Sequence, residues 1–207
     1  MTEKQLSRKD RERQRHRQEI LEIALKLYVE KGFNAVSMQE IADESEFAVG
    51  TLYNFFRSKE ALFEELTENC GERILSDLME ILDGPGNEVE RLTCLIRSLP
   101  KLLEEHADFI KLYVSELGMR GAKLSKGRNV NKVDVVLNSR LEQLLEAGIC
   151  KGVFRPVDPT VTAKAINSVM ETLAFEIAGK FDKAIARDMF DKVEQLFIEG
   201  LLLPRGQ

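Results

Sequence analysis

The chain has 207 residues and a mass of 23.6 kDa, and 43% of its residues are hydrophobic while 31% are charged. This composition excludes a disordered chain, and no apolar run is long enough to span a membrane. The three cysteines are far apart and only two histidines accompany them, so we expect neither a disulfide framework nor a metal site. The basic N-terminus has no apolar stretch behind it, which excludes a secretory signal and favours a cytoplasmic protein.

The net charge of −5 is distributed unevenly along the chain. Residues 1–17, the basic arm, contain seven Lys or Arg and three Asp or Glu residues and carry +4, so the remainder carries −9. A cationic segment on an acidic body can bind a polyanion locally while the body stays soluble. A solvated tail without function is the alternative interpretation.

Two helices are predicted before residue 46. Apolar residues recur every three or four positions over 20–28, which indicates one face of a helix that Gly32 ends. Ser37 and Glu40 form a capping box at the start of a second, short helix that runs to about Ser45.

A third helix is predicted to begin near Ala48, after a turn of a few residues. Two short helices joined in this way form a helix-turn-helix. A step of 100° per residue places Val49, Leu52, Tyr53 and Phe56 on the inward side of this helix. The outward side is then formed by Gly50, Thr51 and Asn54, with Phe55 on its flank.

The rest of the chain is also predicted to be helical. Ser58 caps a fourth helix of about 24 residues, or roughly 36 Å, which ends at a loop over 83–87. Helical periodicity predicts a fifth helix bent near Pro100, a sixth over about 108–118 and a seventh ending at Gly148. Asp158 and Pro159 begin an eighth, and a ninth ends the chain. We therefore predict an all-α fold of about nine helices.

Two motifs carry a resemblance to a known family. The segment Ser37-Met-Gln-Glu-Ile-Ala and the segment Gly50-Thr-Leu-Tyr-Asn-Phe-Phe-Arg-Ser-Lys-Glu-Ala-Leu62 resemble the DNA-binding signature of the tetracycline-repressor (TetR) family of bacterial regulators. The resemblance is close over residues 17–66, and beyond them it rests on helix count and on residues 146–159. It implies the basic arm at 1–17, a three-helix helix-turn-helix DNA-binding domain at 18–66, and a helical ligand-binding and dimerisation domain at 67–207.

The third helix is the expected recognition helix. A helix that enters the major groove of double-stranded DNA needs an outer face that is small or able to bond base edges. Gly50 and Thr51 allow close approach, Asn54 can bond adenine or phosphate, and Phe55 can lie against a thymine methyl group. The alternative is an ordinary solvated face. The resemblance implies DNA contacts at Arg17, Ser37, Met38, Gln39, Val49, Gly50, Thr51, Tyr53, Asn54, Phe55 and Lys59.

Two of these residues, Tyr53 and Lys59, can also be interpreted in a second way. Tyr53 lies near the predicted core edge, so its ring can pack while its hydroxyl reaches a phosphate. Lys59 opposes the dipole at a helix N-terminus, a cost that a bound phosphate would offset, and the alternative is a solvated lysine. The sequence departs from the family at Glu46, where glycine is usual in the turn, and at Ala48, where serine often caps the recognition helix.

A homodimer is expected because one recognition helix makes too few contacts to bind its operator tightly. Two subunits would read the two half-sites of a palindromic operator. The last two helices have broad apolar faces, which the resemblance implies form the interface and which an internal core explains otherwise. The candidate interface residues are Phe175, Ile177, Phe190, Phe197 and Leu201.

The resemblance also implies a cavity for an unknown small-molecule effector. The candidate lining residues are Phe109, Tyr113, Glu116, Asn167 and Glu171, although core packing or solvation explains each of them as well. A basic run indicates either an anionic effector or an exposed loop; it consists of Arg120, Lys123, Lys126, Arg128 and Lys132.

We therefore expect a dimeric, ligand-responsive transcriptional repressor. The sequence has no GxSxG elbow, phosphate-binding glycine loop, HExxH motif or paired nucleophile and base, so an enzyme and a cofactor are not expected. A helical interaction scaffold without DNA affinity is the alternative.

Overall fold

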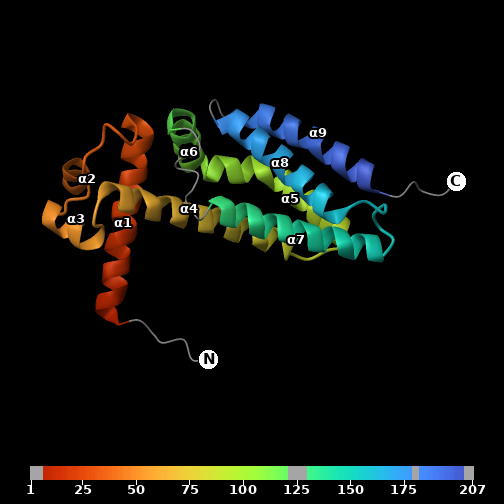
Figure 1. The fold of residues 1–207 in the computed structure, drawn as a ribbon, viewed down its shortest axis with the longest axis horizontal. Coiled ribbons are helices and arrows are strands. Elements are labelled where there is room, and N and C mark those ends of the chain that lie inside the picture. Colours follow the sequence, from red (N-terminus) through yellow and green to blue (C-terminus); the bar gives the residue numbers. More distant parts are fainter. Residues whose placement is uncertain (1–6, 121–129, 179–181, 203–207) are drawn as a thin grey trace. The chain divides into compact units, whose positions relative to one another are not determined.

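The computed structural model describes residues 7–120, 130–178 and 182–202, with the side chains of 116–120 and 130–131 outside the description (Figure 1). These ranges form nine α-helices and no strand, which confirms the predicted all-α fold. The chain divides into two compact units, Met1–Thr67 and Glu68–Gln207. None of the described helices combines the length and the apolar character needed to cross a membrane.

The first unit contains three helices and the start of a fourth. They are α1 (Arg8–Lys31), α2 (Met38–Glu44), α3 (Val49–Phe55) and the first turns of α4 (Lys59–Leu82). The helix α1 begins at Arg8 because Ser7 accepts a hydrogen bond from the backbone N–H of Asp10. Most of the predicted basic arm is therefore helical and continuous with α1.

An aromatic cluster and a few aliphatic side chains form the core of this unit. Gly32 ends α1 with a φ of 80°, a conformation that glycine adopts without steric penalty. The chain then turns so that Phe33 packs edge-on against Phe63, with ring centroids 4.8 Å apart, and 5.3 Å from Tyr28. Leu52 and Leu62 are fully buried beside them. The first unit thus holds α3 through a small, well-defined core.

The second unit is a bundle in which α5 packs mainly on α9 and α7 packs mainly on α8 (Figure 1). Its complete helices are α5 (Glu88–Glu105), α6 (Ala107–Arg120), α7 (Val130–Cys150), α8 (Pro159–Ala178) and α9 (Lys183–Leu201). Asn87 caps α5 in a capping box with Glu90, and Asp158 caps the backbone N–H of Val161 at 2.8 Å. The predicted loop at 83–87 and the predicted start of α8 are confirmed.

A close contact fixes the end of α7. The buried Gly148 lies against Phe154, whose side chain is 1% exposed, and a Cβ added at Gly148 would lie 2.1 Å from the Phe154 ring. The carbonyl oxygen of Gly148 also accepts the backbone N–H groups of Val153 and Phe154. No side chain fits at Gly148 unless Phe154 moves.

We therefore expect Gly148→Ala to lower the free energy of unfolding by roughly 1–3 kcal/mol, because a methyl group would overpack the site. The matched control is Gly71→Ala, since a Cβ at this buried helical glycine would lie 3.6 Å from Val133, an ordinary contact. Urea unfolding followed by circular dichroism should show the control equal to or more stable than the parent chain. Equal stability of the Gly148 variant and the parent would contradict this account.

Candidate nucleic-acid interface

The predicted recognition helix, α3, presents one open face. Gly50, Tyr53 and Asn54 are exposed, and Tyr53 and Asn54 follow Gly50 by three and four residues, so both lie on the same side of the helix as Gly50, with Thr51 half-buried next to it. Leu52, on the opposite side, is fully buried. Tyr53 is 52% exposed, so it belongs to the open face and not to the inward side that the 100° projection predicts. The helix has only seven residues, about two turns, so the 100° projection does not define its buried side precisely.

The turn between α2 and α3 shows both departures from the family pattern. Glu46 has a φ of 58°, a left-handed conformation that costs a residue with a Cβ roughly 1 kcal/mol. Ala48 precedes α3 without a side-chain hydrogen bond to cap it. This is the position where the sequence departs from the glycine that is usual in the family, and a glycine would adopt this φ without steric penalty. The helix α3 consequently depends on its neighbours for stability.

The start of α2 contains three predicted contact residues, which the structure places differently. The Ser37 hydroxyl accepts the backbone N–H of Glu40 at 3.1 Å, as the capping motif predicts, but the Glu40 carboxylate pairs with Lys31, so the reciprocal half of the predicted capping box is not formed. Ser37 and Gln39 are exposed. Met38, however, is only 7% exposed, because it packs into the core of the first unit. Met38 is therefore a core residue in this structure and not a residue of the surface.

Arg17 is a positioning residue for α3. Its guanidinium group forms a two-pronged ion pair with Glu65, and its Nη1 atom donates to the carbonyl oxygen of Phe55 at 3.0 Å. It also lies 4.6 Å from the centroid of the Phe56 ring. The hydrogen bond with Glu65 raises the pKa of Arg17. This cation joins α1 to the end of α3 and is already paired, so the sequence expectation of a direct DNA contact is not supported by its geometry.

Lys59 also serves the fold. Its Nζ atom donates to the carbonyl oxygens of Phe33 and Val36, both at 2.8 Å, and lies 4.5 Å from the Phe33 ring centroid. Carbonyl oxygens of the loop after α1 therefore compensate the cation at the start of α4, where sequence analysis expected a phosphate. A solvated lysine, the other interpretation, is also excluded by this geometry.

Phe55 lies between two partners that sequence analysis did not assign to it. Its half-buried ring is 6.5 Å from the Phe47 ring, and the guanidinium carbon of Arg13 lies 5.6 Å from its centroid. Arg13 also donates to the carbonyl oxygen of Asn54 at 3.4 Å. The sequence contains one feature that could have indicated these contacts. Arg13 and Arg17 are four residues apart, which places both on one side of α1.

In the second unit, several predicted ligand residues come together. The Phe109 and Tyr113 ring centroids are 6.0 Å apart, and Tyr113 lies 5.7 Å from Phe175. The buried Asn167 side chain donates to Asp134 at 3.3 Å. Burial, together with the nearby carboxylates of Glu171 and Asp134, raises the pKa of Tyr113 to about 12.

The structure describes only part of two further predicted ligand features. The side chain of Glu116 and most of the basic run lie outside the described residues. Lys132 of that run is described, and its Nζ atom pairs with Glu72 at 3.1 Å. Asp134, which sequence analysis did not select, joins Tyr113 and Asn167 because it lies on the side of α7 that packs on α8.

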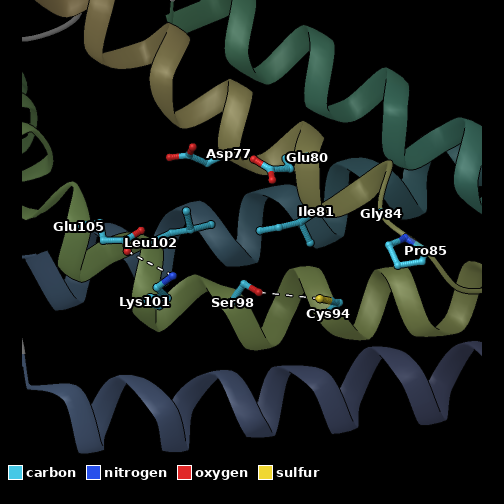
Figure 2. A pocket seen from close by; sticks show the side chains of 10 residues that line it. All are labelled: Asp77, Glu80, Ile81, Gly84, Pro85, Cys94, Ser98, Lys101, Leu102 and Glu105. Atoms are coloured by element: carbon cyan, nitrogen blue, oxygen red, sulfur yellow. Dashed lines mark hydrogen bonds and ion pairs between the residues drawn. The ribbon is translucent and has the colours of Figure 1, made fainter.

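A separate groove of about 450 Å³ lies between α4 and α5 (Figure 2). Beside it, His106 Nε2 is 2.8 Å from the Asp77 carboxylate, which links the end of α5 to α4. None of the predicted ligand residues lines this groove. Its lining consists of Asp77, Glu80, Ile81, Gly84, Pro85, Cys94, Ser98, Lys101, Leu102 and Glu105.

The predicted dimer residues divide between core and surface. Ile177 on α8 and Phe190 and Leu201 on α9 are at most 4% exposed, because α8 packs on α7 and α9 packs on α5. These three residues follow the alternative interpretation, an internal core, while Phe175 and Phe197 are half-buried. The exposed large apolar side chains on α8 and α9 are Val161, Ile185 and Leu196.

A small helical unit whose open helix follows a short turn is a helix-turn-helix DNA-binding unit. Residues 20–66 match the sequence model of bacterial regulatory proteins of the tetR family, and residues 89–195 match the tetracyclin repressor-like C-terminal domain. The chain belongs to the TetR family, and it is a DNA-binding transcriptional regulator.

Individual relatives agree with this assignment. The HTH-type transcriptional repressor KstR2 of Mycobacterium tuberculosis is 29% identical over 140 residues, which cover 68% of this chain and 70% of the relative. The solved structure of that ketosteroid transcriptional regulator covers 91% of this chain and 95% of its own, with 21% identity and a TM-score of 0.65. The fatty acid degradation regulator FadR of Bacillus halodurans covers 89% and 95%, with 22% identity and a TM-score of 0.74. The two structures show that the fold is shared.

The pairing of Arg17 with Glu65 can be tested by amide hydrogen exchange in the full-length protein. We expect Arg17→Ala to speed exchange of the α3 amides about 5- to 30-fold, because α3 loses roughly 1–2 kcal/mol of support. The combined change Arg17→Ala and Glu65→Ala should have less effect than the two single effects added together. Arg15→Ala, at an exposed position two residues earlier, is the control. Simple additivity would show that the pair does not act as a unit.

Proposed function

We propose that the protein is a homodimeric repressor that binds a palindromic DNA operator in the cytoplasm and is released from it by a small-molecule effector. The observation that carries the proposal is the open face of α3, where Gly50, Tyr53 and Asn54 are exposed on a helix anchored from behind by Leu52. The residue at one end of this face, Gly50, is small, and the residue at the other end, Asn54, is polar, as entry into the major groove requires.

Each residue of this face has a distinct proposed task. Gly50 lets the backbone approach the groove, and the Asn54 amide can bond an adenine edge or a phosphate. Thr51 can contact either a base or the backbone, and the Tyr53 hydroxyl can donate to a phosphate. The exposed Ser37 and Gln39 at the start of α2 are further contact candidates. Val49 and Phe55 are half-buried and contribute at the edge of the face.

The DNA backbone needs cations, and α1 supplies them. Lys9, Arg11 and Arg15 are exposed on its first turns. Arg13 and Arg17, in contrast, hold the end of α3. The basic arm thus divides into exposed cations that can neutralise phosphates and cations that support the recognition helix.

The dimer is proposed to form through the outer sides of α8 and α9. Val161, Ile185 and Leu196 are 64%, 58% and 65% exposed, so a partner subunit that covers them would remove large apolar side chains from water. They replace Ile177, Phe190 and Leu201 as interface candidates. A dimer formed through this surface would contain two copies of α3, one for each half-site of an operator.

The DNA-binding face can be tested with the operator, identified by selecting bound fragments from the source genome. We expect Thr51→Ala combined with Asn54→Ala to weaken operator binding at least about 30-fold, because each lost base contact is worth roughly 1–3 kcal/mol. Fluorescence anisotropy of a labelled fragment would measure the affinity, with Gln143→Glu on α7 as a control expected to bind normally. Unchanged affinity of the double variant, or no salt-dependent binding of any DNA, would refute the proposal and favour a scaffold.

The dimer surface can be tested by light scattering after size exclusion. We expect Leu196→Glu to shift the protein from dimer to monomer and to lower operator affinity, because a buried charge without a partner opposes association. Gln143→Glu introduces the same side chain on α7 and should leave the dimer intact. A Leu196→Glu protein that stays dimeric would place the interface elsewhere.

A further inference from the structure

Polar side chains from three helices meet inside the second unit. Asp134 and Asn138 lie one turn apart on α7, and Asn167 and Glu171 lie one turn apart on α8. Tyr113 belongs to α6, and its ring centroid lies 5.7 Å from that of Phe175, which follows Glu171 by one turn on α8. We call Tyr113, Asp134, Asn138, Asn167 and Glu171 the polar cluster. Four of its members lie on α7 and α8, two helices that pack on each other.

The polar cluster contains more hydrogen-bond acceptors than donors. The Asn167 amide donates to Asp134, but no described Lys, Arg or His side chain bonds either Asp134 or Glu171. The side-chain carbonyl oxygen of Asn138 is buried and receives no hydrogen bond from any described group. A buried acceptor without a donor destabilises a protein, so this arrangement favours a ligand that brings N–H groups.

The charges of the polar cluster also favour a ligand that brings N–H groups, and in particular a cationic one. Burial and the neighbouring Asp134 raise the pKa of Glu171, as expected for two carboxylates without a shared cation. The phenol of Tyr113 is neutral at its ordinary pKa, and burial and the two carboxylates raise that pKa further, to about 12, so it adds no negative charge to the cluster. A positive charge placed between the carboxylates would therefore be stabilised by both of them.

The surroundings suit an organic ligand. The rings of Tyr113 and Phe175 lie 5.7 Å apart beside the cluster, and aromatic faces attract cations and apolar groups alike. Tyr113, Asp134 and Glu171 are half-buried, so a ligand can reach them. Among the described side chains, no group of three or more His, Cys, Asp or Glu residues is placed to hold a metal ion.

From these observations we propose that the effector of this regulator is an organic cation, with an ammonium or amidinium group that binds Asp134, Asn138 and Glu171 and an apolar body that packs on Tyr113 and Phe175. The proposal rests on the proposed function, because it names the class of the effector. Lys132, the described member of the basic run, is paired with Glu72 and does not bond these carboxylates.

The test compares two probes that differ in charge, 4-phenylbutylamine and 4-phenylbutyrate. Isothermal titration calorimetry with the full-length dimer, without DNA, should show binding of the amine and no binding of the carboxylate. Glu171→Gln should weaken amine binding at least about tenfold, because a charge-assisted hydrogen bond is lost while the side-chain shape is kept. The control Glu176→Gln changes an exposed carboxylate on the same helix and should leave binding unchanged.

Operator release provides the second measurement. The amine should lower the affinity of the parent protein for its operator, and it should do so less in Glu171→Gln. Equal binding of both probes, or amine binding that is unaffected by Glu171→Gln in a variant that melts like the parent, would overturn the proposal. If the protein binds its operator but neither probe, the effector class is wrong while the proposed function stands. If it binds no DNA, the proposed function itself fails.

Discussion

A helix of seven residues is unstable in water by itself, and the activity of this protein depends on holding one such helix in place. The helix α3 has no side-chain cap at its start and follows a left-handed residue, so its own sequence contributes little to its stability. Its stability comes from outside, through the burial of Leu52 and through arginines of α1 that bond carbonyl oxygens at its end. The rest of the first unit is arranged around this requirement.

The helices themselves could be predicted from the sequence because their signals are local. A capping residue, a glycine with positive φ or an apolar repeat acts within a few residues, as Ser37, Gly32 and Asn87 show. The open face of α3 was predicted in part for the same reason. Tyr53 was placed on the wrong side because one face of a two-turn helix is too short to define the direction of burial.

The hydrogen-bond and ion-pair partners of the cationic side chains could not be predicted, because each pair joins residues that are far apart in the chain. Arg17 pairs with a carboxylate 48 positions away, and Lys59 bonds carbonyl groups 23 and 26 positions away. A cation in a DNA-binding sequence therefore looks the same whether it faces a phosphate or another part of its own fold. The apolar surface of α9 posed a similar problem, since periodicity cannot reveal that α5 covers Phe190 and leaves Leu196 uncovered.

The hydrogen bonds of Lys59 with the loop after α1 have a consequence for genetics. Under the proposed function, in which Asn54 contacts the operator, a selection for loss of repression would recover changes at Lys59 beside changes at Asn54, and both would map to the same small region of the gene. Only Asn54 faces outward; Lys59 acts through Phe33 and Val36. Suppressor mutations would separate the two groups, because altered operator bases can restore a lost base contact but cannot rebuild a displaced loop.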